Sequence, residues 1–328
     1  PRASTFGPFD AADAGEGGLV WIKNRDDGTA DHSLWDTERG AFKYLKSNIT
    51  DAEIDLTSIS TGLTAFNSNG FTLSGGDKRF NKSANDFASW TFRKAPKFFD
   101  VVTYTGNGVS GRQISHNLGT KPGFIIVKRT DTGNDPYNGW RTAHIEGSTL
   151  TAMDLNTTSD ASTTPWFLWS DSSTTTSAYA AAQQTSTYFT VGSHASINGS
   201  GGTFVAYLFA HNDGDGEFGS TADQDIIKCG SYTGNGSLSG PSVDLGFEPQ
   251  WIMIKAASRT GEWIIHDNMR GMAVSGADAF LIPNGSGAEQ SGARVDVTAT
   301  GFNLTTDGTI WNDNNQTYIY IAIRRGPM

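Results

Sequence analysis

An acidic, glycine-rich segment is the part of this 328-residue chain whose side chains are best suited to chemistry. Asp213, Asp215 and Glu217 alternate with glycines in residues 212–219. Carboxylates at that spacing are the ligands that a hard cation such as Ca²⁺ or Mg²⁺ requires. The segment departs from the helix-loop-helix calcium motif, since Phe218 stands where that motif has glycine. The alternatives are therefore a Ca²⁺ or Mg²⁺ site at the three carboxylates and a solvated acidic turn.

Two tryptophans could form a platform for glycan. Trp166 and Trp169 stand in a stretch rich in Ser and Thr, and flat aromatic faces stack on the apolar surfaces of sugar rings. In an extended chain, alternation places Trp166 and Trp169 on opposite faces. We expect at least one of them to pack in the core, which leaves the other as the candidate for sugar binding.

Residues 106–111 match the pattern Gly-x-Gly-x-x-Gly of dinucleotide-binding loops. That chemistry needs a helix directly after the glycines, to place its N-terminus at the pyrophosphate. Gly119 and Pro122 follow instead, so the glycines predict a turn.

The sequence gives little support for a hydrolase. The chain contains no Gly-x-Ser-x-Gly elbow, and the histidines do not recur at equivalent places in the repeats described below. Asp36 and Glu38 could serve as a glycosidase pair, but they are neighbours in sequence rather than gathered from several strands. We predict that the chain is not an enzyme and has no catalytic residues.

The strands and turns that must position these residues are parts of an internal repeat. The sequence Tyr-Thr-Gly-Asn-Gly occurs at residues 104–108 and again at 232–236, and an apolar run ending in Lys follows each copy. A similar run, Leu-Val-Trp-Ile-Lys, ends at Lys23. Such self-similarity outranks any single motif in deciding the fold. It predicts three units, at residues 1–96, 97–212 and 226–328, with residues 213–225 as an acidic linker.

Each predicted unit begins and ends with a strand. The closing strands, such as residues 85–93, alternate between two faces, which is typical of a half-buried strand. Asn-Gly or Thr-Gly steps upstream predict tight turns. In the first unit no Tyr-Thr-Gly-Asn-Gly opener is present, so residues 1–17 replace the opening strand or are its remnant. An Arg-Gly pair recurs at Arg39 and Arg270, and we expect these arginines to pair with carboxylates as structural braces.

Composition narrows the class of protein. The chain has 39 Gly and only 18 % charged residues, which suits a turn-rich all-β protein. Its net charge of −10 argues against nucleic acid as a partner. The single cysteine excludes an internal disulfide, and no apolar stretch is long enough for a membrane span. Units of this length suit small β-sandwiches in tandem.

The junction string in residues 209–236 resembles an uncharacterised repeat domain in virion proteins of tailed phages, particularly marine phages and cyanophages. Leu-Gly-Phe-Glu-Pro-Gln-Trp at 245–251 and Ile-Ala-Ile-Arg-Arg at 321–325 carry the same resemblance. The resemblance implies concanavalin-like or jelly-roll-like β-sandwich units in a tail-fibre-like structural protein located in the virion.

From these observations we expect a tail fibre or appendage component that associates with other virion proteins and with itself, as a homotrimer, and contacts host surface glycan. Two alternatives remain: a capsid decoration or head-fibre protein, and a polysaccharide depolymerase.

Overall fold

A computed structural model describes residues 17–132, 138–162, 169, 177–219 and 221–326. The predicted units are used as labels below: unit 1 for residues 17–96, unit 2 for 97–212 and unit 3 for 226–326. Residues 1–16, on which the prediction of a replaced or remnant opening strand falls, lie outside the described residues.

Strands are the main regular structure, with 43 % of residues in strands and 6 % in helices, so the chain is all-β as predicted. Unit 1 contains β1 (Gly18–Asn24), β2 (Ser33–Asp36), β3 (Lys43–Tyr44), β4 (Ile54–Asp55), the 3₁₀ helix η1 (Thr57–Ile59), β5 (Gly62–Asn67), β6 (Gly70–Ser74) and β7 (Phe87–Arg93). Unit 2 contains β8 (Phe99–Thr105), β9 (Arg112–Ser115), β10 (Pro122–Arg129), β11 (Arg141–Glu146), β12 (Thr149–Asp154), α2 (Ser177–Ala182), β13 (Tyr188–Val191), α3 (Ala195–Asn198) and β14 (Thr203–Ala210). Unit 3 contains β15 (Ile227–Thr233), β16 (Ser242–Asp244), β17 (Pro249–Ala256), β18 (Trp263–Asp267), β19 (Asp278–Leu281), β20 (Gln290–Gly292), β21 (Val295–Thr298), β22 (Gly301–Leu304), α4 (Thr309–Asn312) and β23 (Thr317–Arg324).

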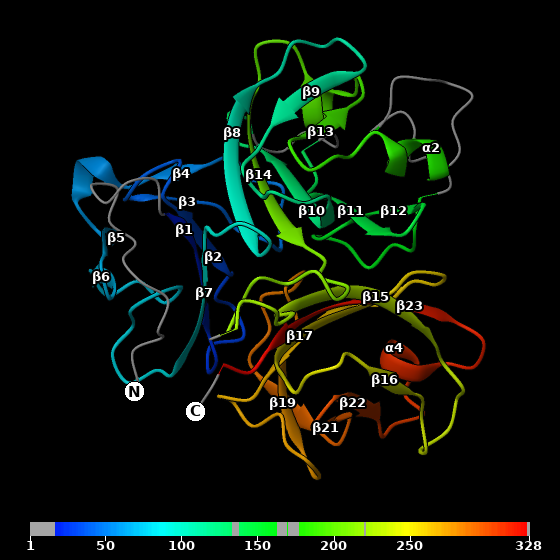
Figure 1. Cartoon of the computed structure of the whole chain (residues 1–328). Helices are drawn as coiled ribbons and strands as arrows, with labels where there is room; N and C mark the ends of the chain where they lie inside the picture. The colour runs from blue at the N-terminus through cyan, green and yellow to red at the C-terminus, as the bar shows by residue number, and fades with distance from the viewer. Residues whose placement is uncertain (1–16, 133–137, 163–168, 170–176, 220, 327–328) are drawn as a thin grey trace.

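Each unit pairs a large antiparallel sheet with a smaller one. The large sheets have the orders β2-β1-β7, β12-β11-β10-β14-β8 and β15-β23-β17-β18-β19-β20. The smaller sheets are β5-β6, β13-β9 and β16-β22-β21, and β3-β4 is a further small sheet in unit 1. The predicted tight turns are formed, since Asn67 pairs with Gly70 and Thr298 pairs with Gly301 across two-residue turns. Three lobes result, which lie around a common centre (Figure 1).

The three large sheets share one hydrophobic core at that centre. Side chains alternate along β1, so Val20 and Ile22 face the interior of unit 1, whereas Leu19 and Trp21 join a cluster that draws on all three units. Rings from different units touch there: Phe92 of unit 1 lies 5.5 Å from Trp251 of unit 3 between ring centroids. The central strands of the large sheets, β1, β10 and β17, are therefore buried on both faces.

Burial on both faces corrects one expectation from the sequence. The closing strand of unit 1, β7, alternates between buried and more exposed residues as predicted. The closing strands of units 2 and 3 are buried at nearly every position after the first. Their apparent alternation does not mark a solvent face, because the central core covers one side and the unit's own interior covers the other.

The repeated Tyr-Thr-Gly-Asn-Gly sequence forms a turn after the opening strand, as predicted. In unit 3, the hydroxyl of Tyr232 donates to the carbonyl of Trp311 at 2.7 Å, and the backbone N–H of Asn235 donates to Oδ1 of the buried Asn312 at 2.8 Å. Unit 2 repeats both bonds, from Tyr104 to Ile197 (2.6 Å) and from Asn107 to Asn198 (3.0 Å). The strand β9 follows the turn in unit 2 where a nucleotide loop would need a helix.

The first glycine of this sequence is required by close packing. A Cβ at Gly234 would overlap the carbonyl oxygen of Asp313, which belongs to the backbone and cannot move aside cheaply. We predict that Gly234→Ala lowers the free energy of unfolding by about 1–3 kcal/mol, the usual cost of overpacking. Gly76→Ala is the matched control, because a Cβ at Gly76 would meet nothing within 4 Å. Urea unfolding measures both, and equal effects would contradict this explanation of the motif.

Candidate functional site: the polar junctions between units

The residues best placed for polar chemistry lie where one unit meets the next. Three junctions exist, here called 1–2, 2–3 and 3–1 after the units that they join. Each has the same backbone hydrogen bond at an equivalent place: Glu53 N to Thr130 O (2.9 Å), Ala161 N to Ala257 O (2.8 Å) and Glu289 N to Arg25 O (2.7 Å). The units thus contact one another in cyclic order, as heterologous contacts do in a closed ring.

A ring side chain also reaches across each junction. It stands at the start of β2, β11 or β18, or one residue before it. Trp140 of unit 2 donates its Nε1–H to the carbonyls of Lys46 and Ile49 of unit 1, at 2.8 and 3.1 Å. Trp263 of unit 3 donates to Asp154 O of unit 2 at 3.0 Å.

At junction 3–1 the equivalent ring is His32 of unit 1. Trp21 donates to its Nδ1 at 2.9 Å, so Nδ1 carries no hydrogen and Nε2–H donates to Ile282 O of unit 3 at 3.1 Å. Burial keeps the pKa of His32 well below its usual value, which maintains this neutral form.

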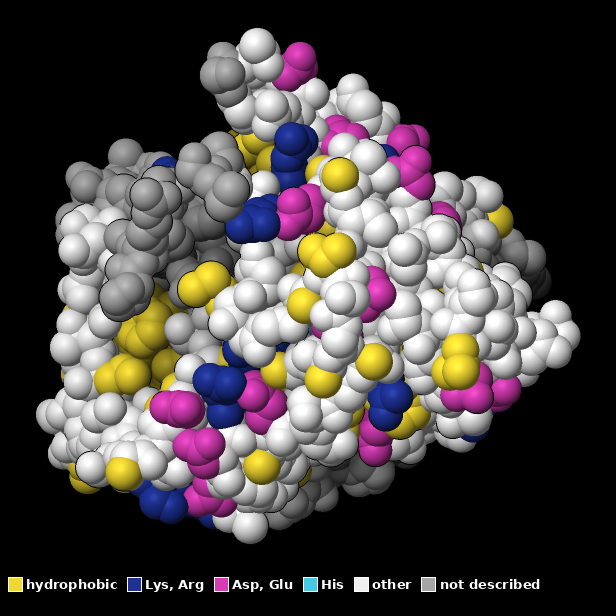
Figure 2. Space-filling view, turned by 90° about the horizontal axis from the view of Figure 1, so that it is seen from below, with side chains coloured by type: hydrophobic (Ala, Val, Ile, Leu, Met, Phe, Trp, Pro, Cys, Tyr) yellow, Lys and Arg dark blue, Asp and Glu magenta, His cyan; other side chains and the backbone are white. Residues whose placement is uncertain are grey.

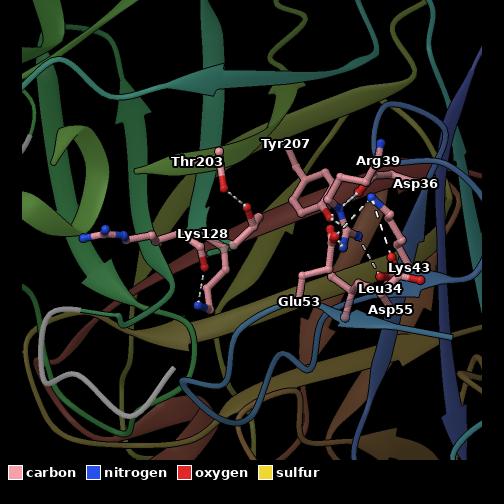
Figure 3. A network of polar contacts seen from close by, with 11 residues as sticks. Leu34, Asp36, Arg39, Lys43, Glu53, Asp55, Lys128, Thr203 and Tyr207 are labelled. Carbon is pink, nitrogen blue, oxygen red and sulfur yellow. Dashed lines mark hydrogen bonds and ion pairs between the residues drawn. The ribbon is translucent and has the colours of Figure 1, made fainter. Parts of the chain in front are cut away.

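Junction 1–2 contains a buried ion-pair network, drawn in Figure 3. Arg39 donates from Nε to Oδ2 of Asp36 at 2.6 Å and from Nη1 to Oε2 of Glu53 at 3.2 Å. Tyr207 of unit 2 reaches across the junction and donates its hydroxyl to Asp36 at 2.8 Å. Only 4 % of the Arg39 side chain is exposed and none of Asp36 is. Burial opposes the charge on Arg39, but the neighbouring carboxylates outweigh it and raise the pKa of the guanidinium.

Junction 3–1 repeats the network with one change of residue. Arg270 donates to Asp267 at 2.6 Å and to Glu289 at 3.0 Å, and the group that crosses to Asp267 is the indole N–H of Trp90, at 2.9 Å. Arg25 of unit 1 adds a two-pronged bond to Glu289, at 2.8 and 2.7 Å. Burial alone would raise the pKa of the Glu289 carboxyl, but hydrogen bonds from Arg25 and Arg270 hold it below its usual value. The arginine braces expected from the sequence are therefore present.

Within the described ranges, junction 2–3 shows no arginine brace. In the strand register His144 lies opposite Phe124. The equivalent residues of the other two units are carboxylates: Asp36 lies opposite Leu19, and Asp267 lies opposite Trp251. Burial lowers the pKa of His144 to about 4, so the imidazole is neutral near neutral pH.

A lysine stands one residue before the end of the central strand of each large sheet and is fully buried: Lys23, Lys128 and Lys255. The Nζ of Lys128 donates to Arg129 O at 2.6 Å and to Thr50 O of unit 1 at 3.4 Å. Lys255 repeats this pattern with Ala256 O at 2.7 Å and Thr158 O of unit 2 at 3.4 Å. Burial is the main cause that lowers the pKa of these lysines, to about 8, 7 and 8 in chain order.

None of these groups forms a catalytic arrangement among the described residues. His266 faces the interior of unit 3, where Trp311 donates to it at 3.2 Å, whereas Asp267 faces the junction. Asp36 lies in the buried brace, and Glu38 pairs with Lys94 at 2.8 Å near the surface. A hollow of about 300 Å³ beside Phe247 contains Arg325, but Glu248 accepts from this arginine at 2.6 Å.

The structure does not gather the predicted cation ligands. The side chain of Asp213 is 83 % exposed, and Glu217 pairs with Lys97 at 2.9 Å. Asp215 lies 3.8 Å from the same lysine. Over the described ranges, no three His, Cys, Asp or Glu side chains come together in a way that could hold a metal ion. A Ca²⁺ or Mg²⁺ site at Asp213, Asp215 and Glu217 stays a prediction.

The glycan platform needs a correction. Trp169 is fully buried in the central core and cannot stack on a sugar, so its part in the prediction is wrong. Its large apolar ring fills the core, as the alternation argument allowed for one of the two tryptophans. Trp166 lies outside the described residues.

Sequence reasoning missed the partners of the repeated turn, Asn198 and Asn312. Both asparagines are fully buried and both stand nine residues before equivalent positions of the closing strands, Tyr207 and Ile321. That equal spacing in units 2 and 3 is the signal from which the sequence could have identified the two asparagines. The junction lysines also recur in the sequence, but nothing local indicated that a central core would cover them.

Comparison with protein families now adds one finding. A family model described as Domain of unknown function (DUF7483) matches residues 14–327. The chain belongs to this family. The match spans all three units. No curated protein matches the chain. Among the residues that the structure describes, no helix has the length and apolar character needed to cross a membrane.

We expect the buried brace of this family member to be far more important for stability than a surface pair of equal length. Arg39→Met should lower the free energy of unfolding by about 3–5 kcal/mol, because it leaves buried carboxylate charge without its partner. Arg325→Met removes a bond of the same length, but 40 % of that side chain is exposed, and the loss should stay below about 1 kcal/mol. Denaturant titration compares the two variants, and a small effect at Arg39 would contradict the assignment.

The junction lysines predict an alkaline gain in stability. An unfolded lysine keeps a pKa near 10.5, whereas folded Lys128 titrates near 7. Between pH 8 and 9.5 the unfolded state therefore binds more protons, and stability rises with pH by about 1.4 kcal/mol per pH unit for Lys128. Above this window, buried tyrosines such as Tyr207, whose pKa is raised by burial, oppose the rise.

Lys128→Met should reduce this slope by the contribution of one lysine. Lys82→Met is the control, since the Lys82 side chain is 48 % exposed. The measurement is urea unfolding at several pH values between 8 and 9.5. An unchanged slope in Lys128→Met would show that this lysine is charged in the folded protein.

Proposed function

We propose that this chain is a structural component of a phage virion, a tail fibre or appendage, and that it is not an enzyme. The observation that carries the proposal is where the repeated residues lie. Those that recur in equivalent places form turns, sheet cores and junction contacts, such as the bonds of Trp140 and Trp263 across their junctions. A protein exposed on a particle needs this kind of rigidity, because local opening exposes it to proteolysis and denaturation.

The phage assignment itself comes from the sequence resemblance at the junction string and the end of the chain. The fold is compatible with that assignment, since sandwiches with short turns expose few flexible backbone segments. Self-association as a homotrimer and binding to other virion proteins belong to the same proposal.

Host contact is assigned to the segments in which the three units differ, chiefly residues 131–188 and 273–292. Tyr179 and Val274 lie in these segments with 39 % and 76 % of their surface exposed. An exposed aromatic ring is a suitable group for stacking on a sugar. Trp166 belongs to the first of these segments and stays the second candidate for glycan contact.

The position of the chain in the particle tests the proposal. We expect antibody raised against the purified protein to label the tail or its appendages in electron micrographs of intact virions, and density for the three lobes to be found there. Label spread over the capsid lattice would favour a decoration or head-fibre protein instead. The same purified protein should release no oligosaccharide from host capsule or lipopolysaccharide, and release would favour a depolymerase.

A further inference from the structure

His144 stands at junction 2–3 in the place where the other two junctions have a braced carboxylate. Only 1 % of its surface is exposed, and its Nε2 makes no hydrogen bond among the residues that the structure describes. Asp36 and Asp267, in the equivalent places, each accept bonds from an arginine and from a ring of the next unit. Junction 2–3 therefore has a buried imidazole where the others have an ion pair.

The donor that crosses the junction is replaced as well. Tyr207 and Trp90 reach across their junctions from matching positions of β14 and β7, each opposite the residue that precedes the buried lysine of its central strand by two. The matching position of β23 in unit 3 is Ile321. An isoleucine side chain can neither donate nor accept a hydrogen bond, so it suits an uncharged neighbour.

Unit 3 covers the imidazole. Its strand β15 packs against β10, β11 and β14 of unit 2, and the backbone of Gly230 and of Tyr320 lies close enough to act on His144. Within unit 2, β10 and β12 place Phe124 and Thr151 beside it, and the Phe124 ring lies 6.3 Å away between centroids. The titratable side chains of this junction are His211 and Glu146 of unit 2 and Cys229 and Tyr320 of unit 3.

A proton on His144 would be held away from water in the closed junction. On the surface, Lys and Arg side chains lie beside Asp and Glu side chains, as Figure 2 shows for one face, and water reaches them. In junction 2–3, burial is the main cause that lowers the pKa of His144, His211 adds repulsion, and the two backbone groups of unit 3 offset only part of this. A charged His144 is therefore stabilised when unit 3 moves away and water reaches the ring.

The direction of the pH effect follows from the two states of the junction. An exposed histidine has a pKa near 6.5, whereas the pKa of buried His144 is about 4. Between these values the open junction binds more protons than the closed one, so acid favours opening. The ratio of open to closed junction rises by up to about tenfold for each pH unit from 6.5 down to 4. Above this range His144 is neutral in both states and has no effect.

We propose that junction 2–3 is an acid-operated switch: when His144 gains a proton, unit 3 separates from unit 2 there, while junctions 1–2 and 3–1 keep the three units together. At junction 3–1, hydrogen bonds from Arg25 and Arg270 lower the pKa of Glu289, so this carboxylate keeps its charge in mild acid. The linker holds units 2 and 3 in one chain, which makes the opening reversible. The inference stands on the composition of the junction and does not depend on the virion role.

The chain supplies its own reporter for this opening. Cys229 is the only cysteine of the chain, it is buried, and its Sγ donates to Ala210 O of unit 2 at 3.4 Å. The reagent 4,4′-dithiodipyridine labels accessible thiols even in acid. Dividing its rate with the folded protein by its rate with the urea-unfolded protein at the same pH gives a normalised rate that measures opening. We expect this rate to rise by about tenfold or more from pH 7 to pH 4.5, with an unchanged circular dichroism spectrum.

Variants of His144 test whether this residue causes the rise. His144→Phe places a ring that cannot titrate in the same position and should reduce the rise to less than about threefold. Because the larger ring could disturb packing, His144→Gln is the second variant, and its normalised rate should be equally insensitive to pH whatever its absolute value. The matched control is His116→Gln. Burial lowers the pKa of His116 too, but its Nε2 lies 3.2 Å from Thr185 O within unit 2, so this variant should keep the full rise.

Hydrogen exchange separates the three junctions, because each has one equivalent backbone bond. The amide of Ala161 crosses junction 2–3 to Ala257 O, that of Glu53 crosses junction 1–2, and that of Glu289 crosses junction 3–1. Between pH 7 and pH 4.5, the protection factor of the Ala161 amide should fall by about tenfold or more. The protection factors of the other two amides should fall by less than about threefold.

The proposal is overturned if the normalised labelling rate of Cys229 is the same at pH 7 and pH 4.5. It is also overturned if His144→Phe and His144→Gln both keep the full rise, or if His116→Gln loses it. Equal loss of protection at the three junction amides would overturn it too, since acid would then unfold the whole chain instead of opening one junction.

Discussion

The central strand of each large sheet has to bury both of its faces, and the rest of the structure depends on that constraint. One face covers the small sheet of the same unit, and the other joins the central core with the other two units. All seven residues of β1 are buried, although a sandwich alone would bury only alternate ones. Separating a unit would expose a complete apolar face, so the repeats are modules in sequence and form a single core in space.

A core made this way has to accommodate polar groups at its edges, and the junctions show how the chain does so. Asp36 and Asp267 are buried, and each receives bonds from an arginine of its own unit and from a ring of the next unit. Burying such pairs is costly, so their contribution to net stability is modest. Their stronger effect is to destabilise incorrect arrangements of the units. A unit docked in the wrong order would leave one of these carboxylates without the donor from the next unit. We therefore regard the different donors, Tyr207 and Trp90, as a means of fixing which unit meets which.

The sequence predicted the strands, the turns and the arginine braces, because these depend on local chemistry or on comparing the copies. The two-residue turn before Gly70 and the turn after Tyr232 are examples in which a few residues decide the conformation. The sequence did not predict the central core. A lysine at the end of a strand, such as Lys128, ordinarily indicates solvent, and its burial is imposed by a neighbouring unit. Trp169 is buried as well, which alternation allowed for one of the two tryptophans without showing which.

The junctions also differ in a way that follows chain connectivity. Units 1 and 2 are joined by a short connection and units 2 and 3 by the acidic linker, which Lys97 ties back at Glu217. Units 1 and 3 have no connection between them except through unit 2, so closing the ring there costs the entropy of a long loop. Among the described residues, the bonds that cross this junction include the two-pronged Arg25 bond to Glu289, the His32 bond to Ile282 O, and a hydrogen bond from Ser47 to Pro283 O at 2.6 Å.

Junction 2–3, which a linker holds, has His144 in place of a braced carboxylate. Junction 1–2 has the arginine brace and the crossing Tyr207 although a short connection joins its units, so the brace is not confined to the junction that lacks a direct connection. The side chains that matter most for closure belong to the two units that are farthest apart in the sequence.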